Sequence, residues 1–222
     1  MAEIINITLD GPGGSGKTTL AKEIAKKLSI AYLDTGAMYR GVAYYMMSKN
    51  IDVQDVETVK ANLNSFTLEV VREKDEQKIL INGEDVSGLI RTQEISFTAS
   101  TVSKIPEVRL KLVEMQRAIA KSSSCVIDGR DIGSYVLPDA EYKFYLTADI
   151  DERAKRRYLE QKAKNMEVTL EQVKREMIAR DEQDSKRAFA PLVVPQGAFV
   201  IDTTNMTLDE VLNLILERIK KK

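Results

Sequence analysis

The chain has 222 residues, which suits one substantial α/β core with a small insertion and is too few for two full-sized domains. Its 33 basic and 34 acidic side chains nearly balance, at a net charge of −1, so nucleic acid is not the expected partner. Histidine is absent, which excludes Ser-His-Asp and Cys-His catalysis, histidine-ligated zinc and an imidazole general base. The single cysteine, Cys125, falls in an apolar run typical of a buried strand and forms no disulfide within the chain.

The ends of the chain and its apolar stretches carry no membrane signal. Met1-Ala2-Glu3 lacks a basic leader, and no apolar stretch approaches the length of a membrane span. We therefore expect a cytoplasmic protein with neither a membrane nor a nucleic acid as partner. We also expect a monomer.

The strongest motif is Gly-Pro-Gly-Gly-Ser-Gly-Lys-Thr at 11–18, which fits the phosphate-loop pattern G-x-x-x-x-G-K-[ST]. An apolar β-branched run precedes it, and apolar residues at helical spacing follow it, so the motif joins a strand to a helix. Such a loop turns several backbone N–H groups toward one anion, at the positive end of the helix. This context disfavours an ordinary glycine-rich turn. The predicted triphosphate-binding residues are Gly11, Pro12, Gly13, Gly14, Ser15, Gly16, Lys17, Thr18 and Thr19.

Two residues of this region are candidates for chemistry at the phosphates. We expect Lys17 to reach the β- and γ-phosphates and the Thr18 hydroxyl to bind Mg²⁺. Asp128 ends the apolar run Cys125-Val126-Ile127, where a Walker-B-type acid would lie, and we predict it as the second Mg²⁺ ligand. Strand-terminal aspartates are also common turn residues, so this alternative stays open.

The first third of the chain alternates strands and helices and then changes character. A strand is predicted at 31–33, a helix from near Ala37 and a short helix at 55–63. Residues 64–92 instead show period-two alternation with turns at 73–76 and 82–83, which indicates a β-hairpin or a three-stranded meander. We predict an inserted β subdomain at 64–92, with 1–63 and 93–222 as the core. A decorated edge of the main sheet is the alternative.

The remainder returns to alternation of helix and strand. We expect helix over 92–121 interrupted around Pro106, strands at 125–128 and 142–146, and a charged helix at 150–165. A capping box at Thr169 to Gln172 predicts a helix to about Asp184, and a last strand at 198–202 precedes a helix capped at 207–210. The predicted fold is α/β: a P-loop core with a parallel sheet flanked by helices, a small inserted antiparallel β subdomain and a helical lid at about 150–168.

Arginines recur near the predicted ends of strands and helices. Arg40, Arg130, Arg180 and Arg187 together indicate a second anion site beside the phosphate loop. Three more, Arg153, Arg156 and Arg157, lie on the charged helix and could close over the triphosphate as a flap. An ordinary solvated helix face explains these three equally well.

The sequence resembles the bacterial cytidylate kinases, a family of nucleoside monophosphate kinases. The phosphate loop alone is common to many ATPases, but the Thr-Gln-Glu, Asp-Gly-Arg-Asp and Arg-Ala-x-Ala-Pro-Leu segments together point to this family. The resemblance spans almost the whole chain. It rests on Asp10 through Thr18, Leu33 through Arg40, Ile90 through Glu94, Asp128 through Asp131 and Arg187 through Leu192.

This resemblance implies transfer of the γ-phosphoryl group of ATP, with Mg²⁺, to the 5′-phosphate of CMP or dCMP. The attacking phosphate oxygen is already ionised, so no strong base is needed and the absence of histidine agrees. We expect Lys17, Arg130, Arg153 and Arg157 to be catalytic. The residues that the resemblance places in the monophosphate site are Thr35, Tyr39, Arg40, Ser100, Arg109, Arg130, Asp131, Arg180, Asp184 and Arg187. Position 35, often serine in the family, is threonine here.

Two other classes fit parts of the pattern. A P-loop GTPase switch would need a guanine-binding N-K-x-D segment, and the sequence has none. A P-loop kinase for another small acceptor, such as UMP, AMP or a shikimate-like compound, fits the core equally well. Only the acceptor-site residues argue against it.

Overall fold

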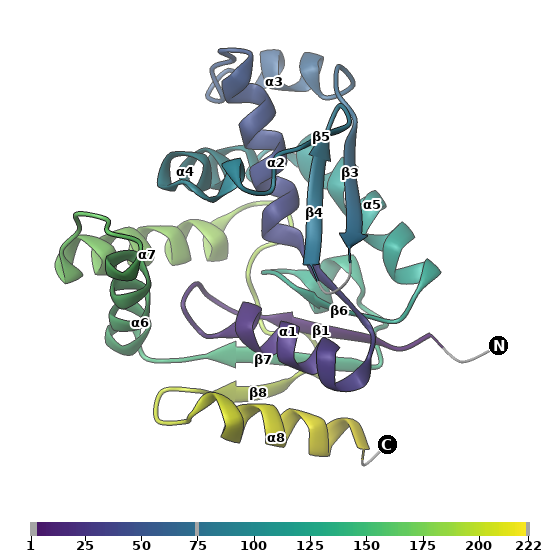
Figure 1. The fold of residues 1–222 in the computed structure, drawn as a ribbon, viewed down its shortest axis with the longest axis vertical. Helices are drawn as coiled ribbons and strands as arrows, with labels where there is room; N and C mark the ends of the chain where they lie inside the picture. The colour runs from purple at the N-terminus through teal and green to yellow at the C-terminus, as the bar shows by residue number, and fades with distance from the viewer. Residues whose placement is uncertain (1–3, 74–75, 221–222) are drawn as a thin grey trace. The chain divides into compact units, whose positions relative to one another are not determined.

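A computed structural model describes residues 4–73 and 76–220 (Figure 1). The chain forms two compact units. The first unit contains residues up to 32 and from 123 onward, and the second contains residues 33–122. The N-terminal residues 1–3 and the centre of the turn predicted at 73–76 lie outside the described residues.

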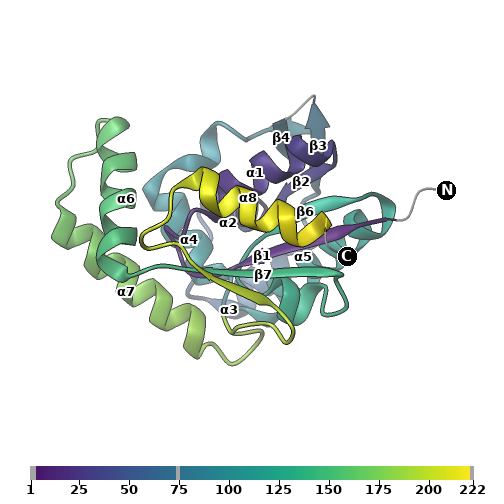
Figure 2. The same cartoon turned by 90° about the horizontal axis from the view of Figure 1, so that it is seen from below.

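The main sheet is parallel and has the strand order β2-β6-β1-β7-β8; its residues belong to the first unit except for Leu33 and Asp34 at the end of β2. Strand residues such as Ile7, Val126 and Phe144 are buried, as expected for apolar strands covered by helices. Helices α1 and α8 lie side by side and pack apolar residues into this core (Figure 2). The elements are β1 (Asn6–Asp10), α1 (Lys17–Leu28), β2 (Ala31–Asp34), β6 (Cys125–Asp128), β7 (Tyr142–Thr147), β8 (Phe199–Asp202) and α8 (Leu208–Lys220).

Two further helices, α6 (Ile150–Ala163) and α7 (Leu170–Lys186), pack together through Ala154, Val173 and Met177. The capping box predicted at Thr169 and Gln172 is present. Helix α6 ends two residues before the predicted position, because Asn165 adopts a left-handed backbone conformation with φ 57°. A five-residue π-helix, η2 (Ile132–Val136), follows β6 and was not predicted.

The second unit holds an antiparallel sheet of order β3-β4-β5, separate from the parallel sheet. The predicted antiparallel element is thus confirmed, and the alternative of a decorated sheet edge is wrong. Helix α2 packs closely on β4, since a Cβ on Gly41 would lie 2.9 Å from Ile79 Cγ2. The elements are α2 (Thr35–Ser48), α3 (Val56–Asn62), β3 (Leu68–Glu73), β4 (Glu76–Ile81), β5 (Glu84–Asp85), η1 (Leu89–Arg91), α4 (Gln93–Val102) and α5 (Pro106–Ser122).

Most helix boundaries follow from local chemistry. Helix α2 begins at Thr35, two residues earlier than predicted, because the Asp34 carboxylate accepts the N–H of Ala37 as its N-cap. The predicted interruption around Pro106 is confirmed, with α5 starting at that proline. The boundaries predicted for the inserted subdomain, residues 64–92, stay a prediction.

Among the described residues no helix is both long enough and apolar enough to cross a membrane.

Candidate active site

The phosphate loop joins β1 to α1 and requires glycine at particular positions. Gly11 has φ 141°, and a Cβ there would lie 1.9 Å from the carbonyl oxygen of Leu146 on β7. Gly14 and Gly16 also have positive φ, of 75° and 88°. A Cβ on Gly14 would lie 2.9 Å from Met177 Cε, so the loop packs tightly against α7. Glycines therefore permit both the curled backbone and its close approach to the rest of the unit.

Lys17, at the start of α1, is buried and its ammonium group bends back onto the loop. Nζ donates to the carbonyl of Pro12 at 2.6 Å and to Ser15 Oγ at 3.2 Å. Burial, and next the positive charge of Arg130, hold the pKa of Lys17 well below its ordinary value, although nearby carboxylates oppose this. An anion entering the loop would favour the protonated amine. The loop is thus electrostatically suited to a polyphosphate.

The two predicted metal ligands are in direct contact. Thr18 Oγ1 donates to Asp128 Oδ2 at 2.7 Å, and the Tyr32 hydroxyl donates to Asp128 Oδ1 at 3.1 Å. Hydroxyl and carboxylate oxygens suit a hard cation such as Mg²⁺. Across residues 4–73 and 76–220, no group of three or more His, Cys, Asp or Glu side chains could hold a metal. A cation at this pair would therefore keep most of its waters, as Mg²⁺ commonly does.

Four of the predicted acceptor-site residues meet in the first unit. Arg130 Nε donates to Asp184 Oδ2 at 3.0 Å, and Arg187 forms ion pairs with Asp131 at 3.2 Å and Asp184 at 3.7 Å. Both carboxylates are buried. Arg130 also approaches the phosphate loop, since a Cβ on Gly13 would lie 3.7 Å from Arg130 Nη2. We call Arg130, Asp131, Asp184 and Arg187 the arginine–aspartate cluster. Arg180, also predicted, is exposed on α7.

The three arginines predicted to form a flap on α6 have different environments. Arg153 is buried, and its guanidinium donates to the carbonyl of Gly13 at 3.1 Å, to Asp181 at 2.6 Å and to the carbonyl of Ala148 at 2.9 Å. Arg153 is thus already in contact with the phosphate loop.

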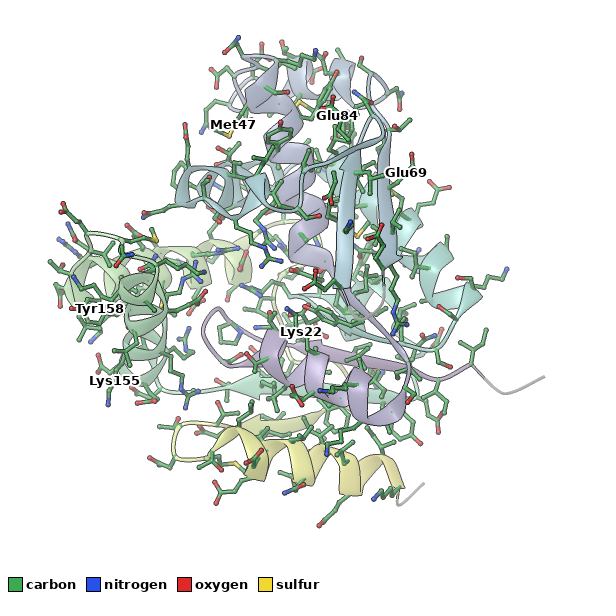
Figure 3. All side chains as sticks on the ribbon, viewed as in Figure 1. Lys22, Met47, Glu69, Glu84, Lys155 and Tyr158 are labelled. Carbon is green, nitrogen blue, oxygen red and sulfur yellow. The ribbon has the colours of Figure 1, made fainter. Side chains whose placement is uncertain are left out.

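The other two lie away from that contact. Arg156 donates to Thr203 Oγ1 at 3.1 Å and to the Thr203 carbonyl at 2.8 Å, which ties α6 to the residues after β8. Arg157 is more exposed and pairs with Glu160 at 2.8 Å, one turn along the same helix. Lys155 and Tyr158, labelled in Figure 3, lie on the same helix.

The remaining predicted residues lie in the second unit. Arg109 is buried on α5, and its guanidinium lies over the ring of Tyr39 at 5.4 Å. Its Nη1 donates to the Ser103 carbonyl at 3.3 Å, one helical turn from Ser100. These three predicted residues therefore share one region.

The start of α2 in the second unit is also rigidly built. Arg40 pairs with Asp34 at 2.9 Å, next to the buried Thr35. The side-chain amide of Gln77 on β4 accepts the N–H of Asp34 at 2.7 Å and donates to the Asp34 carbonyl at 3.2 Å. Gln77 was not foreseen, because a polar residue in a hairpin strand resembles any solvated one.

Sequence reasoning also missed three residues of the first unit, namely Tyr32, Asp181 and Asp10. Asp10 is fully buried, and its carboxylate accepts the N–H groups of Ile132 and Gly133, each at 2.7 Å. Burial raises its pKa to about 7, even though these hydrogen bonds act in the opposite direction. The signal in the sequence was an aspartate directly between an apolar strand and a glycine-rich loop. A buried carboxylate is rare unless it has such partners.

Cys125 behaves as expected. Its thiol is buried, donates to Asn6 Oδ1 at 3.1 Å, and has its pKa raised to about 12 by burial. It is therefore an unreactive strand residue.

Comparison with known proteins decides the family. The family model described as "Cytidylate kinase" matches residues 7–221. The chain belongs to the cytidylate kinase family. It is 48% identical over 213 residues to a cytidylate kinase of Caldicellulosiruptor saccharolyticus, which covers 96% of this chain and 94% of that protein. It is 43% identical over 218 residues to one of Halalkalibacterium halodurans, covering 98% of both. The predicted family is confirmed, and the chain is a kinase, a phosphotransferase.

The fold has a counterpart among solved structures. A crystal structure of an uncharacterized protein from Eubacterium ventriosum matches with a TM-score of 0.52 and 15% identity, covering 98% of this chain and 99% of that one. At this identity the likeness concerns the fold of the kinase alone.

Proposed function

We propose that this kinase transfers the γ-phosphoryl group of ATP to the 5′-phosphate of CMP or dCMP, giving ADP and CDP or dCDP. The observation that carries the proposal is the arginine–aspartate cluster beside a complete phosphate loop within one compact unit. The full-length relatives named cytidylate kinase support the choice of acceptor. A GTPase switch and a kinase for another acceptor have no comparable support.

The phosphate loop would hold ATP. Its backbone N–H groups and the α1 N-terminus would bind the phosphates, and the Lys17 ammonium would leave the Pro12 carbonyl for the anionic oxygens. Arg153 would act from its present position, because its contact with the Gly13 carbonyl already fixes it to the loop. Arg156 is held by Thr203, whereas Arg157 is more exposed and pairs with Glu160 on its own helix, so Arg157 is the better candidate for closure over the phosphates.

Thr18 and Asp128 would hold Mg²⁺, because together they supply the hard oxygen ligands that this ion prefers. When bound, the ion would neutralise charge on the phosphate oxygens. Tyr32 would keep the carboxylate oriented through its hydrogen bond to Asp128 Oδ1. A cytoplasmic location and a monomeric state stay predictions.

The arginine–aspartate cluster would take part in binding the monophosphate. Two guanidinium groups match the charge of a phosphate, and the carboxylates hold them in place. The acceptor oxygen is already ionised, so the chain needs to align two phosphates and neutralise their charge, and no side chain has to remove a proton. The residues from the second unit, Thr35, Tyr39, Arg40, Ser100 and Arg109, stay predicted contacts of the nucleoside and its phosphate.

A substrate panel tests the proposal. Release of ADP would be measured in a coupled assay with CMP, dCMP, UMP, AMP and shikimate as acceptors, with ATP and Mg²⁺ in excess. We expect CMP and dCMP to have the highest kcat/KM. A higher value for AMP, UMP or shikimate would refute the assigned acceptor, and ATP hydrolysis without phosphorylation of any of them would refute the assigned reaction.

A further inference from the structure

Asp10 joins the phosphate loop to a second segment of the first unit. It is the last residue of β1, and the loop begins at the next residue. Its Oδ1 accepts the N–H of Ile132 and its Oδ2 accepts that of Gly133, both at 2.7 Å. One carboxyl group thus satisfies two successive N–H groups at the start of the π-helix η2, at distances typical of well-formed hydrogen bonds.

The close approach depends on glycine at position 133. A Cβ there would lie 2.8 Å from Thr8 Oγ1, 3.1 Å from Pro195 Cγ and 3.2 Å from Asp10 Oδ2. Any larger residue would displace the backbone from the carboxylate. The pair of Asp10 and Gly133 is therefore a matched contact.

A second contact fixes the same segment three residues before Ile132. The N–H of Gly129 donates to the carbonyl of Leu9 on β1 at 3.0 Å. The segment 129–133 is thus attached to the end of β1 at both of its ends. The two residues between the attachments are Arg130 and Asp131, both members of the arginine–aspartate cluster.

We propose that Asp10 is a positioning residue for the phosphoryl acceptor: its carboxylate fixes the backbone at 132–133 and thereby sets Arg130 and Asp131 relative to the phosphate loop. The inference rests on the proposed function. Both oxygens of Asp10 accept backbone N–H groups of the segment 129–133, which carries Arg130 and Asp131. Loss of the Asp10 carboxylate should therefore affect binding of the phosphoryl acceptor more than binding of ATP. A displacement of about 1 Å at a reacting group can cost about a hundredfold in rate.

The variant Asp10→Asn tests the inference with minimal change in volume. Its amide oxygen can accept one N–H group, but its NH₂ group faces the other, and two donors repel. We expect KM for CMP to rise, or kcat to fall, at least about tenfold, while KM for ATP changes less than about threefold. The matched control is Asp55→Asn, which makes the same change at a carboxylate that accepts the N–H of Thr58 as an exposed helix cap. Its kinetics should equal those of the parent.

The variant Gly133→Ala approaches the same contact from the backbone side and decides the question if Asp10→Asn does not fold. We expect the same separation of CMP and ATP effects. Its control is Gly88→Ala, because a Cβ on Gly88 meets no atom within 4 Å and its φ of −73° suits alanine.

Three results would overturn the inference. Equal losses for ATP and CMP would make Asp10 a support of the phosphate loop. A lower melting temperature with unchanged kinetics would make its role structural only, and unchanged values throughout would remove any role. A parent enzyme without CMP kinase activity would instead refute the proposed function, so the two failures are distinguishable.

Discussion

Lys17 is the only side-chain cation within the phosphate loop itself, at 11–18. Replacing it by alanine removes the charge that would follow the transferring phosphoryl group, and a lost electrostatic contact of this kind costs roughly 10²–10³ in kcat. We expect Lys17→Ala to lower kcat at least about a hundredfold. Because burial lowers the pKa of this amine, its charge does not stabilise the fold, and the melting temperature should change by only a few degrees.

The control for this experiment lies on the same helix. Lys26→Ala removes an exposed lysine from the last turn of α1 and should leave kcat unchanged. Turnover of Lys17→Ala within a few-fold of the parent, with circular dichroism unchanged, would contradict the role assigned to the loop.

At the scale of the element, α6 offers two arginines in contrasting environments. Arg153 is buried, and Arg153→Met would remove the donor to the Asp181 carboxylate and to the carbonyls of Gly13 and Ala148. Breaking a buried ion pair costs roughly 3–5 kcal/mol, and we expect the lower end of that range because Asp181 is partly exposed. The variant should lower both the melting temperature and kcat.

Arg157→Met is the matched comparison on the same helix. Its exposed pair with Glu160 contributes at most a few tenths of a kcal/mol, so the melting temperature should not change measurably. If Arg157 closes over the phosphates, kcat should fall at least about tenfold with the stability intact. If kcat also stays unchanged, this part of α6 is an ordinary solvated helix surface. Thermal unfolding and steady-state kinetics on both variants separate these outcomes.

The elements that were predicted correctly have strong local signals in the sequence. The phosphate loop, the capping box of α7 and the break before Pro106 each depend on a few adjacent residues, and all are present. The π-helix at 132–136 was missed because it is held by Asp10, more than a hundred residues away in the sequence. No periodicity within Ile132–Val136 indicates that contact.

At the scale of the whole molecule, the resemblance identified more of the candidate site than periodicity or spacing could. Arg130, Asp131, Asp184 and Arg187 come from two distant segments, and no spacing rule would join them, yet they form one cluster. The hydrogen bonds from Tyr32 to Asp128 and from Arg153 to Asp181, which join residues far apart in the sequence, were not predicted. Long-range hydrogen bonds leave no local pattern in the sequence.

We predict from the chemistry of the base that Arg109 and Asp131 recognise cytosine. Cytosine presents acceptors at O2 and N3 and a donor at N4, which suit an arginine and a carboxylate. Uracil keeps O2 but presents N3–H and O4 in place of N3 and the N4 amino group, so the contacts of the arginine to N3 and of the carboxylate to N4 are lost, at roughly 1–3 kcal/mol each. We therefore expect kcat/KM for CMP to exceed that for UMP at least about a hundredfold.

Two single variants and their combination test this assignment. Arg109→Met and Asp131→Ala should each reduce the ratio of kcat/KM for CMP to that for UMP by about tenfold or more. If both residues contact the same base, the double variant should lose less than the product of the two single effects, because the second substitution removes an interaction that the first has already disturbed. Asp131 also pairs with Arg187, so its loss should lower the melting temperature as well, and only the ratio between the two substrates separates specificity from stability. A ratio that stays at the parent value in both single variants would mean that other residues recognise the base.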